Sequence, residues 1–428
     1  MQTATQRMST PSRLLRKAAE LGPRGTAVRA VARLREEIVR RYPSLQLRRT
    51  ALVVRARTGK PVTAQLREIR SLRRGPGRLP ALDYYAYELY DDRRYSFREK
   101  SEFVGWKPER LSEALNDPHW RELCDDKLLS YALLAGLELP HPAVYAVYHP
   151  TGRTFGRVPS LHTPEAMADF LRDGMRYPFF GKPVKDSFGG GASSVDGIDR
   201  ERDILRLRNG EEIGVEDYVR QVPVKFASGH RLKRFRSGYD SGFLFQERIV
   251  QHPVVDRLSG GRVSSLRLVV LLGPRGPHVH RVTWKLPVGS NITDHVIGRS
   301  GNIKCAVDPR TGRVERVVRG RGPARPGEPY ALGYHGSPTD VHPDTQERLT
   351  DVQLPCWEET IALCLHAATA LPGLRYQSWD MALAPSGPTF LEVNYNGGIS
   401  QVPGYNGLYD DTMKQFIAEA GLAEEFSR

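Results

Sequence analysis

The sequence predicts a soluble globular protein of the α+β class, and three segments support this prediction. Residues 379–383 and 389–393 are apolar and partly β-branched, and they flank a turn rich in Pro and Gly, which is typical of a β-hairpin. Residues 263–272 are almost wholly apolar, as the strands in the middle of a sheet are. Residues 125–136 begin with two aspartates and end at a glycine, which is the pattern of a helix.

Length and composition set the limits within which these elements are interpreted. A chain of 428 residues is long enough for two or three lobes with their own cores. No apolar run approaches the roughly 18 residues that a membrane span requires, and the N-terminus lacks the apolar segment of a secretory signal. We therefore expect a cytoplasmic protein without a membrane span. The 4 cysteines form no C-x-x-C pair, so neither a zinc knuckle nor a disulfide framework is expected.

The net charge of +14 arises in the first 80 residues, which carry 20 Lys and Arg against 4 Glu. Within this segment Val28, Val31, Leu34 and Ile38 recur at three- and four-residue steps, as on one face of an amphipathic helix. We expect residues 1–80 to form a basic, mainly helical extension. Such an extension could bind RNA, anionic lipid, an acidic protein or a negatively charged substrate. The alternative is a solvated helical extension that is packed on the body or partly disordered. No RNA-binding aromatic motif accompanies it, so nucleic acid is not the expected partner.

The hairpin near the C-terminus carries three oxygen-bearing side chains. Residues two apart in a strand point to the same face, so Glu392 and Asn394 project together, and Asp380 on the partner strand can lie on that face too. Mg²⁺ prefers oxygen ligands and usually takes one or two carboxylates together with substrate phosphates. The three residues therefore predict a site for Mg²⁺ and a nucleotide, and a solvated hairpin edge is the alternative.

A second feature is a triple glycine that follows an apolar strand. The strand delivers Lys182, and Gly189, Gly190 and Gly191 come shortly after it. Glycine permits backbone angles that turn successive N–H groups toward one anion. The segment therefore predicts a flexible cover over nucleotide phosphates, although a plain glycine-rich hairpin is the alternative. It is not a Walker loop, because no Gly-Lys-Ser/Thr sequence closes it.

Two further strands end in or contain polar side chains. An apolar strand runs into Gln246 and Glu247, which could meet an adenine edge, and an ordinary strand end is the alternative. Arg267 lies inside the apolar strand and would be costly to bury unpaired. We expect Arg267 to point into a polar cleft toward a carboxylate or phosphate, with a structural salt bridge as the alternative. Lys285 ends another strand and is expected to face the same cleft.

Taken in this order, the pieces resemble the ATP-grasp superfamily. The final hairpin and residues 83–90, 246–253 and 264–267 are most similar to the sugar-transfer associated ATP-grasp family. The resemblance covers roughly residues 82–410 and leaves the basic extension outside. It implies an ATP-grasp fold, with two α+β lobes whose antiparallel sheets clamp ATP. The first lobe, with the segment before it, would occupy residues 81–245, and the second lobe would occupy residues 246–428.

The resemblance also implies roles for particular residues. The positions implied to bind ATP are Lys127, Lys182, Gly189, Gly190, Gly191, Gln246, Glu247, Arg248 and Ile249. The positions implied to hold one or two Mg²⁺ ions are Asp380, Glu392 and Asn394. Arg267 and Lys285 would be catalytic. The positions near the substrate would be Asp294, Asn396, Gly397 and Gly398. Related sequences tend to have Asp-Asn where this chain has Asp294-His295, and Pro near Gly397, which leaves the identity of the substrate open.

The activity that the resemblance implies is carboxylate activation. The γ-phosphoryl group of ATP passes to a carboxylate, and an amine then attacks the acyl phosphate to form an amide. The substrates would be small-molecule or peptide carboxylates and amines, in the biosynthesis of a natural product, a peptide or a surface saccharide. If the protein forms an oligomer, we expect a homodimer. One alternative is a phosphotransferase that uses the same nucleotide site without ligation, and another is a binding module led by the basic extension.

Overall fold

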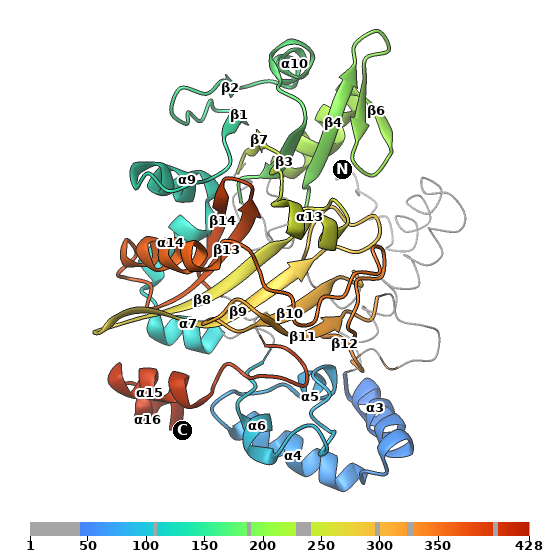
Figure 1. Ribbon diagram of the computed structural model, residues 1–428, viewed down its shortest axis with the longest axis vertical. Coiled ribbons are helices and arrows are strands. Elements are labelled where there is room, and N and C mark those ends of the chain that lie inside the picture. Colours follow the sequence, from blue (N-terminus) through green and yellow to red (C-terminus); the bar gives the residue numbers. More distant parts are fainter. Residues whose placement is uncertain are drawn as a thin grey trace, which may run out of the picture.

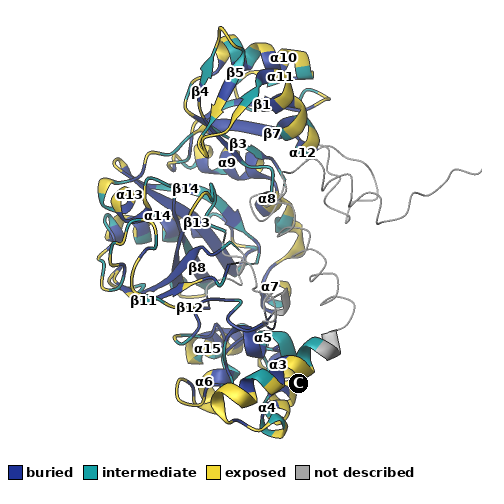
Figure 2. Cartoon of the chain, turned by 90° about the vertical axis from the view of Figure 1, so that its right-hand side faces the viewer, coloured by how far each residue is buried: buried dark blue, intermediate teal, exposed yellow. Residues whose placement is uncertain are grey.

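The computed structural model describes residues 43–105, 109–185, 190–227, 241–295, 300–322, 329, 331–396 and 401–427. Over these ranges, no helix combines the length and the apolar character that crossing a membrane requires. The predicted amphipathic helix from Val28 to Ile38 lies outside the described residues. Three bodies follow one another along the longest axis: a small sheet with its helices, a larger sheet, and a set of N-terminal helices (Figures 1 and 2).

The N-terminal body is helical and has its own core. Its helices are α3 (Pro43–Thr58), α4 (Val62–Arg74), α5 (Ala81–Ala86) and α6 (Phe97–Ser101). Their apolar cluster includes Val54, Leu72 and Tyr84, and it also takes in Ala331 and Leu332 from the second half of the chain. Residues on both sides of position 80 therefore share one core. The domain boundaries at residues 80 and 245 stay predictions.

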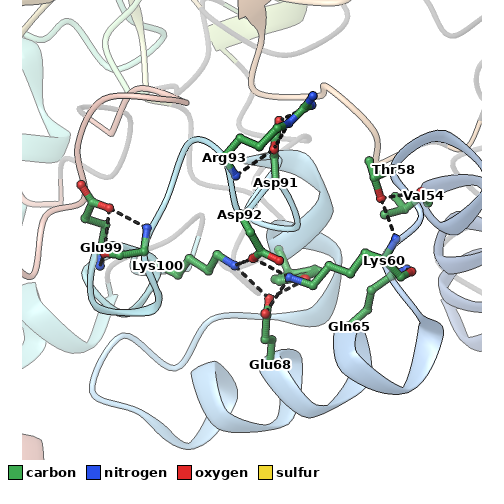
Figure 3. Close-up of polar contacts among 12 residues, drawn as sticks. Val54, Thr58, Lys60, Gln65, Glu68, Asp91, Asp92, Arg93, Glu99 and Lys100 are labelled. Atoms are coloured by element: carbon green, nitrogen blue, oxygen red, sulfur yellow. Dashed lines mark hydrogen bonds and ion pairs between the residues drawn. The ribbon is translucent and has the colours of Figure 1, made fainter.

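A network of charged side chains, in which both lysines are buried, ties these helices together (Figure 3). The Nζ atom of Lys60 lies 2.6 Å from Glu68 Oε1 and 2.7 Å from Asp92 Oδ1. The Nζ atom of Lys100 lies 3.2 Å from Glu68 Oε2 and also contacts Asp92. The hydroxyl of Tyr84 donates to Glu68. Each buried ammonium meets two carboxylates, and this pairing offsets the cost of removing the charge from water.

Short helices connect the N-terminal body to the small sheet. They are α7 (Glu109–Leu115), a 3₁₀ turn (Pro118–Trp120), α8 (Arg121–Asp125) and α9 (Lys127–Gly136). The carboxylate of Asp126 caps α9 by accepting from the backbone N–H groups of Leu128 and Leu129. Arg153 holds this carboxylate through two hydrogen bonds of 2.6 and 2.9 Å. The predicted helix that begins on an acidic cap and ends at Gly136 is confirmed.

The small sheet has the strand order β2-β1-β7-β3-β4-β5-β6 among the described residues. Its strands are β1 (Val144–Tyr148), β2 (Ser160–Leu161), β3 (Phe179–Pro183), β4 (Ser193–Asp199), β5 (Ile204–Leu207), β6 (Glu212–Gly214) and β7 (Phe243–Glu247). β1 and β2 run parallel, and the other described neighbours run antiparallel. The helices packed on it are α10 (Pro164–Asp169), α11 (Val215–Val219) and α12 (Lys225–Ala227), with π-helical turns at Phe170–Gly174 and Arg220–Val224.

The larger sheet has the order β12-β11-β10-β9-β8-β13-β14, and its described neighbours all run antiparallel. Its strands are β8 (Ser265–Gly273), β9 (Gly276–Leu286), β10 (Ile303–Val307), β11 (Val314–Arg319), β12 (Ser337–Pro338), β13 (Tyr376–Ala384) and β14 (Gly387–Asn394). β13 and β14 form the predicted hairpin. The apolar face, with Leu268, Trp284 and Trp379, packs against α14 (Trp357–Thr369).

The opposite face of the larger sheet is divided into two parts. At one end Val269, Leu271 and Tyr376 pack against α15 (Asp411–Glu419) and belong to the same apolar cluster as Phe426 of α16 (Ala423–Ser427). The rest of this face carries charged side chains and lies toward the small sheet. The end of β7 and α13 (Pro253–Ser259) connect the small sheet to the larger one. This polar part of the face positions the site.

Candidate active site

A row of side chains crosses the polar face of the larger sheet. Glu392 of β14 lies opposite Asp380 of β13, Asp380 lies opposite Arg267 of β8, and Arg267 lies opposite Thr283 of β9. Directly opposed residues of antiparallel strands have Cβ atoms about 4.5–5.5 Å apart. The register of four strands therefore brings the predicted metal-binding residues next to the predicted catalytic arginine. Lys285 stands two residues along β9 from Thr283, on the same face.

Asp380 is held by two cations. Arg267 Nε donates to Asp380 Oδ1 at 2.7 Å, a second guanidinium nitrogen donates to Oδ2, and Lys285 Nζ donates to Oδ2 at 3.2 Å. Burial opposes the ionisation of Asp380, but the charges of Arg267 and Lys285 outweigh it and hold its pKa well below the usual range. Burial would lower the pKa of Arg267, and the charge of Asp380 raises it instead. Arg267 thus forms a salt bridge with Asp380, which was the alternative to a position in an open polar cleft.

Glu392 is less tightly engaged than Asp380. Its carboxylate lies 3.9 Å from the guanidinium of Arg267 and 3.9 Å from Lys127 Nζ. The amide nitrogen of Asn394 lies 3.4 Å from Glu392 Oε1. The Glu392 side chain is 30% exposed, whereas that of Asp380 is 6% exposed. Glu392 is therefore the carboxylate of the row that a ligand would reach first.

The donor set of the row suits Mg²⁺. No group of three or more His, Cys, Asp or Glu side chains that could hold a metal occurs in the part of the chain that the structure describes. Two carboxylates and the amide oxygen of Asn394 are nevertheless hard oxygen donors. Mg²⁺ usually takes one or two carboxylates and completes its octahedron with phosphate oxygens and water. The row therefore fits a magnesium–nucleotide complex better than a metal held by protein alone.

Two lysines outside the larger sheet approach the row. Lys182 of β3 donates to the hydroxyl of Tyr131 at 3.0 Å. Burial lowers the pKa of Lys182 to about 8, although the charges of Glu392 and Asp380 oppose this shift. Lys127, the first residue of α9, lies 3.5 Å from the carbonyl oxygen of Val184 as well as near Glu392. One cation from α9 and one from the small sheet thus lie near carboxylates of the larger sheet.

Tyr131 is a residue that the sequence analysis missed. Its hydroxyl accepts from Lys182 and lies 3.1 Å from both Gln246 Oε1 and the carbonyl oxygen of Leu391. It therefore joins α9, β3, β7 and β14 at one atom. The only signal in the sequence is an aromatic residue with a polar tip in a mostly apolar helical segment, and that pattern more often belongs to an ordinary core residue.

The predicted adenine segment lies at the end of β7. Gln246 is buried, Glu247 is exposed, and Ile249 is half-buried in the segment after the strand. Arg248 forms an ion pair with Asp196 of β4. Tyr131 therefore connects Gln246 to Lys182. The side chain of Glu247 is exposed, and that of Arg248 is paired with Asp196.

The remaining predicted positions are only partly described. Gly190 and Gly191 form the turn before β4, and Gly191 has a φ of 76°, where a Cβ would lie 2.4 Å from the Phe226 ring. Asp294 accepts a hydrogen bond from the hydroxyl of Ser265 and lies 3.8 Å from Lys285. Asn396 is half-buried beyond the end of β14. The predicted positions that lie outside the described residues are Gly189, Gly397 and Gly398.

A cavity of about 390 Å³ lies beside the N-terminus of α9. Its lining includes Asp126, Arg153, Lys185 and His149. The charges in it are already paired, because Arg153 binds Asp126 and Lys185 binds Glu122. The cavity therefore lacks the excess positive charge that a polyphosphate would require.

Comparison with known proteins identifies the family. The family described as sugar-transfer associated ATP-grasp matches residues 107–415. A comparison with curated proteins gave no match. Among solved structures, an L-amino acid ligase from Bacillus licheniformis is similar at 15% identity and a TM-score of 0.33, over 64% of this chain and 43% of that chain. The VanG D-Ala:D-Ser ligase from Enterococcus faecalis is similar at 16% identity and a TM-score of 0.35, over 76% of this chain and 67% of that chain.

A D-alanine–D-alanine ligase from Bacillus anthracis is also similar, at 13% identity and a TM-score of 0.33, over 71% of this chain and 67% of that chain. This chain thus spans less than half the length of the B. licheniformis ligase, and about two thirds of each of the other two. The family match covers well over half of the chain and confirms the resemblance seen in the sequence. The two sheets are the lobes of an ATP-grasp fold, and the chain belongs to the sugar-transfer associated ATP-grasp family.

Proposed function

We propose that the protein is an ATP- and Mg²⁺-dependent ligase that joins a carboxylate to an amine through an acyl phosphate. The observation that supports this is the row Glu392–Asp380–Arg267, with Lys127 of α9 and Lys182 of the small sheet close to it. Phosphoryl transfer requires positioning and neutralisation of charge rather than covalent catalysis by the protein. Cations and oxygen ligands gathered at one place are suited to that task.

The nucleotide would lie between the small sheet and the larger sheet. Lys127 and Lys182 would hold the α and β phosphates, and the glycine segment at 189–191 would cover them. The backbone at Gln246–Ile249 would receive the adenine. Glu392 would be the principal protein ligand of Mg²⁺, supported by Asn394 and Asp380. Bound Mg²⁺ neutralises charge on the phosphoryl group that is transferred.

The reaction would proceed in two steps. A substrate carboxylate oxygen attacks the γ-phosphorus, the bond from that phosphorus to the bridging oxygen breaks, and ADP leaves. An amine then attacks the acyl carbon and gives up a proton, the bond from that carbon to the phosphate oxygen breaks, and phosphate leaves. Arg267 has five N–H donors and uses two of them on Asp380 within the described residues. The others remain to stabilise the acyl phosphate, with Lys285 beside them.

Product analysis tests this function. The purified protein would be incubated with MgATP and pairs of amino acids, peptides and small carboxylic acids, and products would be identified by mass spectrometry. A ligase releases ADP and phosphate only when carboxylate and amine are both present, and it yields an amide. Release of ADP with the phosphate retained on a product would instead show a phosphotransferase and overturn the proposal.

A further inference from the structure

A buried lysine of the larger sheet has too few partners for its charge. Lys304 of β10 pairs with Lys285 of β9, so it lies on the polar face one strand beyond the row. It is 2% exposed, and its Nζ donates to the carbonyl oxygen of Gln401 at 2.6 Å. The described residues provide no second acceptor and no carboxylate within ion-pair distance. An ammonium carries three donors, and an uncompensated buried charge is strongly unfavourable.

A second buried group in the same place also lacks a partner. His335 is 7% exposed, and its Nε2 atom has no hydrogen-bond partner in the part of the chain that the structure describes. Burial, and then the charge of Lys304, lower the pKa of His335 well below its usual value. The imidazole is therefore neutral, and in the tautomer that carries its proton on Nε2 it can donate one hydrogen bond. Native proteins pair nearly all buried polar groups, so two incompletely paired groups at one place require an explanation.

Contacts through Gln401 and Tyr87 show that these groups belong to one cluster. Lys304 binds the carbonyl of Gln401, whose side-chain amide donates to the hydroxyl of Tyr87 at 3.2 Å. The ring of Tyr87 stacks on His335 with centroids 4.0 Å apart and planes at 18°. Tyr87 directly follows α5, so the N-terminal body closes one side of the cluster. Lys285 lies opposite Lys304 in the sheet and donates to Asp380, so it connects the cluster to the row.

Other buried lysines of this chain are treated differently. Lys60 and Lys100 each meet Glu68 and Asp92 in the N-terminal body (Figure 3). Lys60 and Lys100, which lie away from the site, are thus neutralised by carboxylates. Lys304 is left with a single carbonyl, on the face that carries the site and within one strand of Lys285. The missing anion is best explained as part of a ligand.

We propose that Lys304 and His335 bind an anionic group, a carboxylate or a phosphate, on one of the two substrates. The inference rests on the proposed ligase function and names the substrate class of the same site. The anion accepts hydrogen bonds from the ammonium of Lys304 and from the Nε2–H of His335. The substrate then extends past Lys285 toward Arg267, so that its reacting group lies at the row and its anionic group lies against the N-terminal body.

The first test measures binding without turnover. Thermal unfolding of the full chain would be followed with Mg²⁺ and a non-hydrolysable ATP analogue, in succinate or inorganic phosphate, at constant ionic strength set with sodium chloride. A ligand that binds the folded state raises Tm. We expect one of the two anions to raise the Tm of the unmodified protein, and which one does so distinguishes carboxylate from phosphate. No rise with either anion overturns the inference.

Variants locate the effect. Lys304→Met removes the charge and keeps the length of the side chain, and His335→Phe keeps the stacking on Tyr87 and removes Nε2. Each should bind the anion about 10–100-fold more weakly, the range expected for loss of a charge-assisted hydrogen bond. Lys414→Met removes a half-exposed surface charge and should keep the full Tm rise. An equal rise in Lys304→Met and the unmodified protein overturns the inference, and His335→Phe decides alone if Lys304→Met does not fold.

The second test separates this inference from the ligase proposal. For a substrate pair found active, Lys304→Met should raise the KM of the anionic substrate about 10–100-fold and leave the KM of MgATP unchanged. An unchanged KM for every substrate overturns the anion site and leaves the ligase intact. If instead no substrate pair yields an amide while the anion still raises Tm, the ligase proposal fails and the anion site stands.

Discussion

Asp380 organises the charge of the site at the scale of single residues. It lies between Glu392 and Arg267 in the register of the larger sheet and accepts hydrogen bonds from Arg267 and Lys285. The identities of these residues were predictable, because carboxylates and an arginine inside apolar strands require polar partners. The choice of partner was not predictable: the sequence favoured a polar cleft with a carboxylate or phosphate for Arg267, and a structural salt bridge was the alternative. Only the strand order decides which carboxylate it meets.

Glu392→Gln tests the metal role of the row. We expect kcat/KM to fall by about 100-fold or more, because an uncharged amide neutralises Mg²⁺ poorly at a position where charge develops. Stability should change little, since the carboxylate is 30% exposed and its ion-pair distances are 3.9 Å. Steady-state ADP release at several Mg²⁺ concentrations measures this. Glu358→Gln, on the exposed side of α14, is the matched control, and near-normal turnover in Glu392→Gln would exclude the metal assignment.

The pH dependence of stability tests the burial of Lys304. Burial lowers its pKa to about 7 from the ordinary value of 10.5. Below pH 7 both the folded and the unfolded chain hold the proton, so the full cost of burying the charge is present. Between pH 7 and 10.5 the folded chain releases the proton while the unfolded chain keeps it, so stability rises through this window.

Lys304→Met removes that dependence. Its free energy of unfolding should exceed that of the unmodified protein most at pH 6, and the difference should diminish as pH approaches 10. His335, whose pKa burial and the charge of Lys304 lower, stays neutral over this range, and Lys285 is the same in both proteins. Urea unfolding at pH 6, 8 and 10 provides the comparison. A difference that is constant with pH would show that Lys304 does not titrate with a lowered pKa.

Among the secondary-structure elements, the β13–β14 hairpin shows which features a local sequence pattern can predict. The turn, the two strands and the common direction of Glu392 and Asn394 followed from residues within one short segment. The placement of β13 between β14 and β8 did not, because strand neighbours depend on the whole sheet. The contacts of Tyr131 were not predictable for the same reason, since three of them are made with other elements.

Tyr131→Phe tests how α9 positions Lys182. The change removes the hydroxyl that accepts from Lys182 and leaves the ring, over which the ammonium lies at 5.2 Å. We expect the KM of ATP to rise about 10-fold, the scale of one hydrogen bond to a charged group, with a smaller change in kcat. Isothermal titration with the non-hydrolysable analogue measures the affinity directly. Tyr145→Phe on β1 is the control, and equal affinities of the two variants would remove Tyr131 from nucleotide binding.

The N-terminal body was the part of the structure that the sequence predicted least well. The sequence indicated a basic extension that ended near residue 80, because composition and charge change there. In the structure α3 and α4 share a core with Tyr84, Ala331 and Leu332. Such a core joins segments far apart in the chain, and local periodicity carries no information about that distance. The family resemblance, by contrast, identified the two sheets correctly, because it draws on the order of motifs along the whole chain.

Gln401→Ala tests the junction between the N-terminal body and the larger sheet. The buried amide of Gln401 accepts from the backbone N–H groups of Val104 and Leu408, and it donates to the carbonyl of Val104 and to Tyr87. Its removal leaves several buried groups unpaired, so the free energy of unfolding should fall by about 2–4 kcal/mol. Urea unfolding measures the loss. The exposed Gln415→Ala should be nearly neutral, and a similar small effect for Gln401→Ala would show that the junction is not tightly packed.

The stacking of Tyr87 on His335 has a consequence for how such a protein can diversify. The elements α9 and β3, which carry Lys127 and Lys182, lie toward the opposite end of the molecule from α3–α6 (Figure 1), whereas Tyr87 directly follows α5. On the anion-site proposal, Lys304 and His335 belong to the same part of the chain as Arg267 and Asp380, and the N-terminal helices contribute the ring of Tyr87 that closes the site. Changes in the helical segment around Tyr87 would then alter the shape of the anion site while Lys304, His335 and the residues of the row stayed in place.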